Sequence, residues 1–196
     1  MKNIAVFASG SGTNAENIIR HFERSDVARV ALIFSDNPQA YVLQRAEQLG
    51  IPVLVVPRGE LRTAPHRIVE LLAAREIDFI VLAGFLSLVP HEIIDAYRGR
   101  VVNVHPALLP AYGGKGMYGM HVHCAVLANK ERESGITIHH VDEIYDNGNI
   151  IAQYRCDVAP QDTPETLAAK IHALEHEHLP QIIEQEIKNN INKKKL

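Results

Sequence analysis

The stretch NIAVFASGSGTNAENIIRHF, residues 3–22, decides the fold. It begins with a short apolar run, NIAVFAS, which stops at the glycine-rich GSGTN. An apolar run of this length between turn residues is typical of a buried strand, and the apolar residues of AENIIRHF recur at helical spacing. The stretch therefore predicts one β–α unit: a strand, a glycine turn and a helix.

The same β–α order recurs through the first part of the chain. Further apolar runs precede amphipathic segments, in the order 27–35, 41–50, 51–57, 66–76, 78–85, 90–97 and finally the run 100–105. Unbroken apolar strands that alternate with amphipathic helices form parallel sheets covered on both faces. We therefore expect an α/β fold with a Rossmann-like, mostly parallel, twisted sheet.

The pattern changes after residue 113. A flexible loop, GGKGMYG, is expected to lead to a short helix. Residues 135–141 and 150–158 are predicted as antiparallel strands, because the turn-rich DEIYDNGN joins them. A long C-terminal helix is expected to start near Thr163 as N-cap with Pro164 at its first position. The tail, residues 189–196, is expected to fray.

Composition bounds the class of protein. With 196 residues, 46% of them hydrophobic, the chain can bury a substantial core, and we expect one domain covering residues 1–196. A net charge of −3 with mixed charge signs argues against a nucleic-acid partner. The N-terminal apolar run is too short to span a bilayer, and Cys124 and Cys156 fit reduced thiols, so we expect a cytoplasmic protein without membrane attachment.

The 11 histidines raise the question of a metal site. The pairs His121/His123 and His176/His178 lack a third ligand at suitable spacing. No metal is therefore predicted.

The glycine-rich loop, residues 9–15, is a candidate anion site. Backbone N–H groups at a helix N-terminus favour a phosphate, and the side chains of Thr13 and Asn14 add donors unless they only cap the helix. The spacing Gly10-x-Gly12-x-x-Ala15, with Asp36 after the second strand, also fits a relaxed dinucleotide fingerprint. Phosphate binding and nicotinamide binding both remain open at this point.

Two polar residues stand where a buried strand ends, in RVVNVHPALLPAY, residues 100–112. Asn103 and His105 are two apart, so they face the same side of the strand, and Pro106 ends it. An amide that donates to an oxyanion beside an imidazole that carries a proton suits acyl-group chemistry. A carboxylate to orient the imidazole is available in the turn at Asp146, but spacing leaves Asp142 and Glu143 as equal candidates.

Five motifs in order resemble those of the phosphoribosylglycinamide formyltransferase family, the folate-dependent transformylases of purine synthesis. They are NIAVFASGSGTN, DFIVLAGFLSLV, RVVNVHPALLPAYGG, GITIHHVDEIYDNGNIIAQ and HALEHEHLP. The resemblance implies direct transfer of a formyl group from the co-substrate 10-formyltetrahydrofolate to the amine of 5-phosphoribosylglycinamide. For such an enzyme we expect a monomer or homodimer that binds these two small molecules.

The resemblance also assigns residues. It implies a catalytic set of Asn103, His105 and Asp146, which favours Asp146 over Asp142. Phosphate and ribose contacts fall on Gly12, Thr13, Asn14, His172 and Glu175. Folate contacts fall on Arg62, Leu86, Ser87, Leu88, Val89, Val141, Asp142, Glu143, Ile144 and Tyr145. Ser87 stands where some relatives carry Arg, and Ala111 where Lys is common. Residues 1–112 are then the phosphate-substrate half, and residues 113–196 the folate-side strands and C-terminal helix.

The expected chemistry follows from these assignments. The Asn103 amide and a protonated His105 donate to the oxyanion, and a buried Asp146 raises the charged fraction of His105. No cysteine nucleophile is needed. A side chain at residue 12, as in Gly12→Val, is expected to crowd the phosphate.

Three other functions fit parts of the sequence. A formyltetrahydrofolate hydrolase is expected to carry an added N-terminal domain, whereas here the first strand starts at Asn3. A methionyl-tRNA formyltransferase is expected to add a C-terminal nucleic-acid-binding domain. A non-catalytic nicotinamide-binding module would rest on Gly10, Gly12, Ala15 and Asp36 alone.

Overall fold

A computed structural model describes residues 1–193, which form a seven-stranded sheet. The strands are β1 (Lys2–Phe7), β2 (Ala28–Ser35), β3 (Val53–Val55), β4 (Phe79–Leu82), β5 (Val101–His105), β6 (Glu133–His140) and β7 (Ile150–Asp157). Their order is β3-β2-β1-β4-β5-β6-β7. Strands β1 to β5 run parallel and β6 and β7 are antiparallel, which confirms the predicted sheet.

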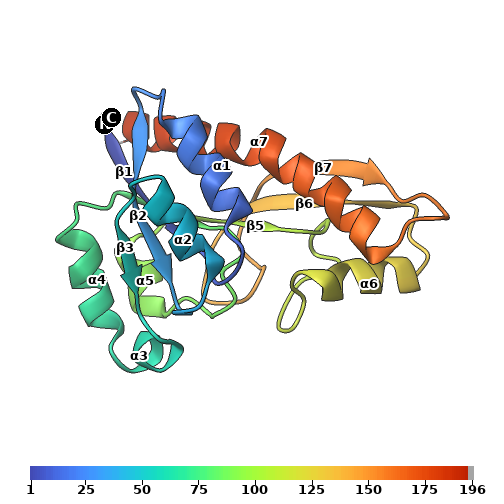
Figure 1. Ribbon diagram of the computed structural model, residues 1–196, viewed down its shortest axis with the longest axis horizontal. Helices are drawn as coiled ribbons and strands as arrows, with labels where there is room; N and C mark the ends of the chain where they lie inside the picture. The colour runs from blue at the N-terminus through green and yellow to red at the C-terminus, as the bar shows by residue number, and fades with distance from the viewer. Residues whose placement is uncertain (194–196) are drawn as a thin grey trace.

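Helices cover both faces of this sheet (Figure 1). They are α1 (Thr13–Phe22), α2 (Tyr41–Gln48), α3 (Arg58–Thr63), α4 (Pro65–Ala73), α5 (His91–Ala96), α6 (Met120–Ala128) and α7 (Pro164–Lys193). One core joins α1, α2, α6 and α7 to one face, and a second core joins α3, α4 and α5 to the other. Alternate residues of a strand supply the two cores: Ile4 and Val6 belong to the first, Ala5 and Phe7 to the second.

The short helix α3 was not predicted. The expected strand 51–57 is regular only over Val53–Val55, and residues 58–63 then form a helix with a single buried residue, Leu61. A six-residue segment with one apolar contact carries no helical periodicity to detect. The expected helix 66–76 is α4, which begins with Pro65 at its first position and ends at Ala73.

The long helix α7 begins as predicted. Thr163 caps it, because its Oγ1 accepts the N–H of Thr166 at 3.3 Å and its carbonyl accepts the N–H of Leu167. The expectation of a frayed tail is wrong for residues 189–193, which remain helical to Lys193. Ile183 and Ile187 are buried, so packing against the sheet stabilises the last turns more than the polar composition suggests. Residues 194–196 lie outside the described part of the chain.

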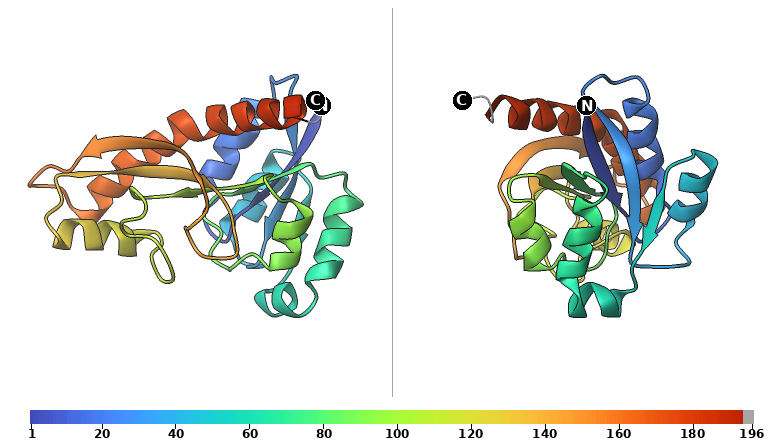
Figure 2. Two further views of the ribbon diagram at one scale, coloured as in Figure 1. Left: turned by 180° about the vertical axis from the view of Figure 1, so that it is seen from behind. Right: turned by 90° about the vertical axis from the view of Figure 1, so that its left-hand side faces the viewer.

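The sheet has a switch point between β1 and β4. From β1 the chain passes to β2 on one side, whereas β4 lies on the other. Ligands of open α/β sheets bind in the crevice beyond the carboxyl ends of strands at such a point. Loops after β1, β4 and β5 meet there. The hairpin β6–β7 extends away from β1 to β4, whereas α7 begins beside that hairpin and runs back past α1 to end near the N-terminus (Figures 1 and 2).

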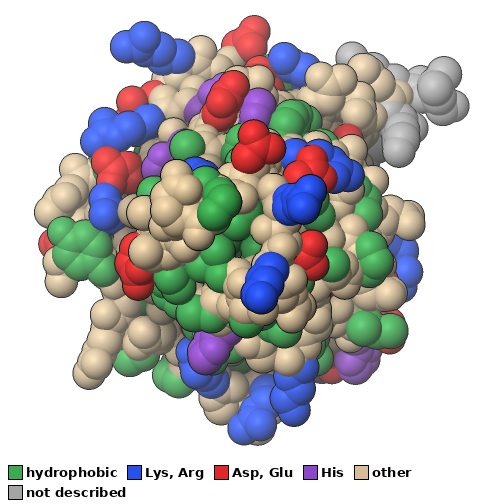
Figure 3. Space-filling view, turned by 90° about the vertical axis from the view of Figure 1, so that its right-hand side faces the viewer, with side chains coloured by type: hydrophobic (Ala, Val, Ile, Leu, Met, Phe, Trp, Pro, Cys, Tyr) green, Lys and Arg blue, Asp and Glu red, His purple; other side chains and the backbone are tan. Residues whose placement is uncertain are grey.

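Charged side chains of both signs are interspersed at the end of the molecule shown in Figure 3, with no single basic field on that face. Within residues 1–193, no helix combines the length and the apolar character needed to cross a bilayer.

Candidate active site

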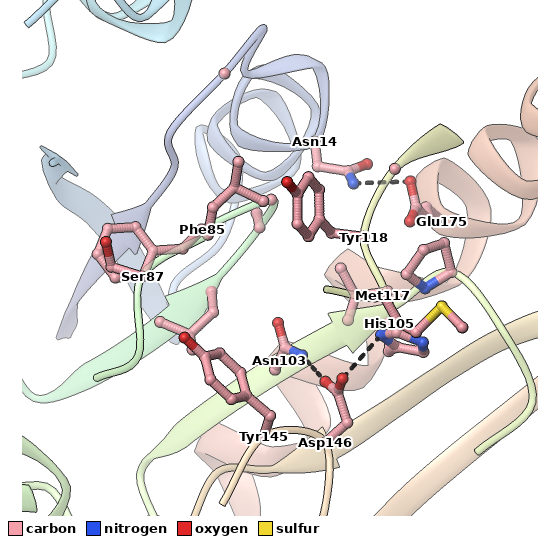
Figure 4. A pocket seen from close by; sticks show the side chains of 18 of the residues that line it. Asn14, Phe85, Ser87, Asn103, His105, Met117, Tyr118, Tyr145, Asp146 and Glu175 are labelled. Atoms are coloured by element: carbon pink, nitrogen blue, oxygen red, sulfur yellow. Dashed lines mark hydrogen bonds and ion pairs between the residues drawn. The ribbon is translucent and has the colours of Figure 1, made fainter. Parts of the chain in front are cut away.

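A cavity of about 730 Å³ opens at the switch point. Its walls come from the glycine loop after β1, the loop after β4, the end of β5, the loop 114–119, the turn after β6 and α7. Figure 4 shows Asn103, His105 and Asp146 together at one side of this cavity and Asn14 with Glu175 at another. Segments that are far apart in sequence therefore share one site.

The glycine loop ends at Gly12, which is the N-cap of α1 and has a left-handed backbone with φ of 77°. No side chain caps the helix, so the capping role considered for Thr13 and Asn14 is absent and both residues lie in the first turn. A Cβ built at Gly12 would lie 2.4 Å from the Val42 side chain and 2.8 Å from its Cα. The expectation that a larger residue would crowd the phosphate is therefore corrected: it would collide with α2 first.

Gly12→Ala should lower the free energy of unfolding by about 2–5 kcal/mol, since a left-handed alanine costs about 1–2 kcal/mol and overpacking costs about 1–3 kcal/mol. Urea unfolding measures this loss. Gly10→Ala is the matched control, because nothing lies within 4 Å of its Cβ position. Equal stability of the two variants would contradict the packing role of Gly12.

Asn14, His172 and Glu175 form one network between α1 and α7. Asn14 Nδ2 donates to Glu175 Oε2 at 2.9 Å, and His172 Nδ1 lies 2.9 Å from the same oxygen. The hydrogen bond that His172 donates to Glu175 raises the pKa of His172 against the opposing effect of burial. Glu175 is 5% exposed, and Asn14 Oδ1 is buried without a partner. The network borders the cavity, and Asn14 Oδ1 is its acceptor without a hydrogen-bond donor.

Asn103, His105 and Asp146 converge as the sequence predicted. His105 Nδ1 lies 3.4 Å from Asp146 Oδ2, and Asn103 Nδ2 lies 3.4 Å from Asp146 Oδ1. The carboxylate therefore spans the two side chains that share a face of β5. Asp142 instead accepts the Ile144 N–H and the Asn147 amide within the turn, so geometry separates the two candidate aspartates.

The turn that carries Asp146 is shaped by its backbone. Asp146 itself has a left-handed φ of 54°, and a Cβ at Gly148 would lie 1.8 Å from the His140 carbonyl oxygen. A non-glycine residue in this region costs about 1–3 kcal/mol and is found where surrounding contacts hold it. Here the Gly114 N–H donates to Asp146 Oδ2 at 2.9 Å and fixes the carboxylate.

The proton on His105 is placed by its neighbours. Nε2 lies 2.7 Å from the Tyr112 carbonyl oxygen, which can only accept, so Nε2 carries hydrogen and Nδ1 faces Asp146. Burial lowers the pKa of His105 below its ordinary value, although Asp146 and the Tyr112 carbonyl act in the opposite direction. Asp146 therefore acts on His105 in the expected direction, but desolvation outweighs the ion pair and the pKa stays below its ordinary value in the free protein.

Asp146 remains ionised. Burial tends to raise its pKa, but His139, whose Nε2 lies 3.7 Å from Oδ1, together with His105 and the Gly114 N–H, lowers the pKa below the ordinary value. The sequence did not point to His139. It pairs with Asn103 across β5 and β6, and its Nε2 lies 3.0 Å from Asn103 Nδ2. Only the strand register places it in the site.

The predicted folate residues mostly meet at the cavity. Leu86, Ser87, Leu88 and Val89 after β4 line it, as do Val141, Asp142, Ile144 and Tyr145 after β6. Arg62, on α3, and Glu143 are exposed and do not line it. The loop 114–119, which the sequence marked only as flexible, adds Met117 and Tyr118 to the walls.

His123 of α6 is another residue that the sequence did not assign to this cavity. It is 3% exposed, its Nδ1 has no partner, and burial lowers its pKa. The sequence HVH, residues 121–123, contains no pattern that predicts a place in this cavity for His123. Among the described residues no group of three or more His, Cys, Asp or Glu side chains is arranged to hold a metal ion.

The nicotinamide alternative fails at Asp36. Its side chain is 0% exposed, and its two carboxylate oxygens accept hydrogen bonds from Ser9, Ser87 and Arg58. A ribose hydroxyl cannot reach a carboxylate that is buried and bonded in this way.

Comparisons with known proteins agree with this arrangement. Residues 2–183 match the formyl transferase family model. The chain is 41% identical over 187 residues to the chloroplastic phosphoribosylglycinamide formyltransferase of Arabidopsis thaliana, covering 93% of this chain and 64% of that protein. It is 39% identical over 189 residues to the Bacillus subtilis phosphoribosylglycinamide formyltransferase, covering 94% of each. The crystal structure of the Bacillus halodurans phosphoribosylglycinamide formyltransferase superposes with a TM-score of 0.86 at 39% identity, covering 94% of both chains.

The sheet order, the cavity at its switch point and the family match define a formyl transferase domain. Within that class, the Bacillus subtilis relative, of which the chain covers 94%, identifies the particular family. The chain belongs to the phosphoribosylglycinamide formyltransferase family.

Proposed function

We propose that the protein transfers the formyl group of 10-formyltetrahydrofolate to the amine of 5-phosphoribosylglycinamide, in purine synthesis. The observation that carries this proposal is the convergence of Asn103, His105 and Asp146 between two distinct walls of one cavity. One wall has the open N-terminus of α1 with Glu175, suited to a phosphate and ribose hydroxyls. The other has the apolar loop after β4, suited to a pterin.

Asn103 supports the oxyanion in this mechanism. The amine attacks the formyl carbon, and the carbonyl oxygen takes up negative charge that preorganised donors stabilise. Both hydrogens of the Asn103 amide are engaged, on His139 at 3.0 Å and Asp146 at 3.4 Å. The 3.4 Å bond is longer than an ordinary hydrogen bond, so that hydrogen is the one that turns to the oxyanion. Each such donor contributes about 3 kcal/mol.

His105 handles the proton. Because its pKa is lowered, the imidazole is largely neutral at rest and takes up the proton that the attacking amine loses. The imidazolium then lies between the Asp146 carboxylate and the Tyr112 carbonyl, both of which stabilise its charge. The bond between the formyl carbon and the folate nitrogen breaks, and that nitrogen receives the proton. No covalent enzyme intermediate forms.

The experiment that tests the function measures tetrahydrofolate release with and without the ribonucleotide. We expect release only when 5-phosphoribosylglycinamide is present, with one formylated nucleotide formed per tetrahydrofolate. Equal release without the nucleotide would identify a formyltetrahydrofolate hydrolase instead. Formylation of methionyl-tRNA in place of the nucleotide would identify the other family member considered.

Glu175→Ala should raise the KM for 5-phosphoribosylglycinamide about 10–100-fold and change kcat little, because charged hydrogen bonds contribute about 1.5–3 kcal/mol each. The variant also removes the group that raises the pKa of His172. Steady-state kinetics with saturating formyl donor measures the effect. Glu177→Ala on the same helix is the control, since its side chain is 67% exposed. An unaltered nucleotide KM would reject the ribose role of Glu175.

Several further assignments stay proposals. We infer that the co-substrate is needed without a metal, that the protein acts in the cytoplasm, and that it is a monomer or homodimer. The single domain, with its division at residue 112 into a phosphate-substrate half and a folate-side half, is likewise inferred. Arg62 keeps a role only if it reaches the folate tail outside the cavity, because α3 holds it away from the walls.

A further inference from the structure

We propose that Asp36 is a positioning residue for the formyl-donor loop, which is defined here as residues 85–89. It acts through the hydroxyl groups of Ser87 and Ser9 and sets which side chains of the loop face the cavity. The inference rests on the proposed function, since it takes this loop as part of the folate site.

The Asp36 carboxylate is the centre of a buried cluster. It follows Ser35, the last residue of β2, and its side chain is 0% exposed. Oδ1 accepts a hydrogen bond from Ser9 Oγ at 2.6 Å. Oδ2 accepts hydrogen bonds from Ser87 Oγ at 2.5 Å and from Arg58 Nε at 2.9 Å. A buried carboxylate is costly unless charge-assisted bonds of this kind surround it, so the cluster holds together as a unit.

Asp36 fixes the formyl-donor loop at two points. Ser87 is bonded to it directly. Leu86 is bonded through Ser9, because Ser9 Oγ accepts the Leu86 N–H at 3.0 Å while it donates to Asp36. Ser9 also donates its own N–H to the Gly84 carbonyl at 3.0 Å, just before the loop. The end of β1 and the formyl-donor loop are therefore joined by one carboxylate.

All five residues of this loop border the cavity, but they differ in how they are held and in how far they are exposed. Phe85 packs edge-on against Phe7 and Phe34, with ring centroids 5.4 and 5.9 Å apart, and Val89 is buried. Between these anchors Leu86 and Leu88 are 40% and 45% exposed and line the cavity. Ser87 lies between the two leucines, and its bond to Asp36 is the polar anchor that turns both of them outward.

Loss of this anchor should affect one substrate only. Leu86 and Leu88 present apolar surface to the formyl donor, whereas the proposed nucleotide contacts lie on α1 and α7. A loop that is free to rotate at Ser87 binds the donor less tightly, because the ordering cost is then paid on binding. The nucleotide site has its own hydrogen bonds and does not depend on this loop.

The experiment compares Ser87→Ala, Asp36→Asn and Ser87→Thr with the wild-type chain. Ser87→Ala removes the donor but leaves the carboxylate paired with Ser9 and Arg58, so the fold should persist. We expect the KM for 10-formyltetrahydrofolate to rise about tenfold in Ser87→Ala and at least as much in Asp36→Asn. In Ser87→Ala the nucleotide KM should stay within about twofold, and Ser87→Thr, which keeps a hydroxyl, should restore the donor KM.

Asp162→Asn is the matched control for a loss of stability alone. Asp162 is a carboxylate with 7% side-chain exposure, bonded to Lys170 and to the Ala159 N–H beside the start of α7, outside the cavity walls. It should lower the melting temperature and leave both KM values unaltered. If the wild-type chain is active, an unaltered donor KM in Ser87→Ala would overturn the positioning role alone. Equal rises of the donor KM and the nucleotide KM in Ser87→Ala would do the same. A wild-type chain that transfers no formyl group would overturn both this role and the proposed function.

Discussion

Replacing His105 with alanine should lower kcat for formyl transfer by about 10²–10⁴-fold, the range that a positioned general acid–base contributes. In the proposed mechanism the imidazole takes the amine proton, and in its absence water must do so without the Asp146 partner. The KM for 5-phosphoribosylglycinamide should change by less than about threefold, because the proposed phosphate and ribose contacts lie elsewhere in the cavity. Steady-state assays of tetrahydrofolate release measure both kcat and the KM for the nucleotide.

Two controls accompany this measurement. His66→Ala removes an exposed imidazole on α4 outside the cavity and should leave kcat unaltered. Because His105 is 3% exposed, its loss also leaves a void, so thermal unfolding of the variant establishes that it is folded. A folded His105→Ala protein with wild-type turnover would remove His105 from the mechanism.

Asp146→Asn should lower kcat by about 10²–10³-fold, on the scale of losing a charge that stabilises the transition state. The amide keeps the shape of the side chain but cannot balance the imidazolium that forms on His105. The same change should lower the pKa of His105 further, since Asp146 is the main influence that opposes desolvation there. Titration of the His105 ring by NMR measures the direction of this shift.

The sign of the pH effect follows from that shift. A lower pKa for His105 means that the folded protein binds its proton only in more acidic solution, whereas the unfolded chain binds it near the ordinary value. Stability that depends on neutral His105 is therefore present above the unfolded pKa and is lost as pH falls. A His105 pKa that rises in Asp146→Asn, or turnover equal to wild type, would contradict the coupling between these two residues.

Much of the fold could be predicted because apolar periodicity reports burial directly. The strand ending at His105 and the helix capped by Thr163 are examples in which a local pattern and the packing agree. Helix α3 escaped prediction because it buries only Leu61, and the last turns of α7 because their stability comes from contacts with the sheet. Tertiary packing decides both segments.

The site was predictable where a local rule or the family pattern fixed a position. Period-two alternation placed Asn103 and His105 together, and the resemblance selected Asp146. His139 depends on the register between β5 and β6, which no local pattern encodes. The charge state of His105 depends on desolvation, and the partners of Asp36 come from the loop after β1, the start of α3 and the loop after β4. Long-range burial was the missing information in each case.

The most direct test of the site is a crystal structure with 5-phosphoribosylglycinamide and an unreactive formyl-folate analogue bound together. We predict the phosphate at the N–H groups of Gly12 to Asn14, the pterin between the formyl-donor loop and the turn after β6, and the formyl carbon beside Asn103 and His105. Hydrogen-bond distances of about 2.7–3.2 Å from Asn103 to the formyl oxygen would support the mechanism. A formyl group bound away from all three side chains, with Asp146 facing solvent, would contradict it.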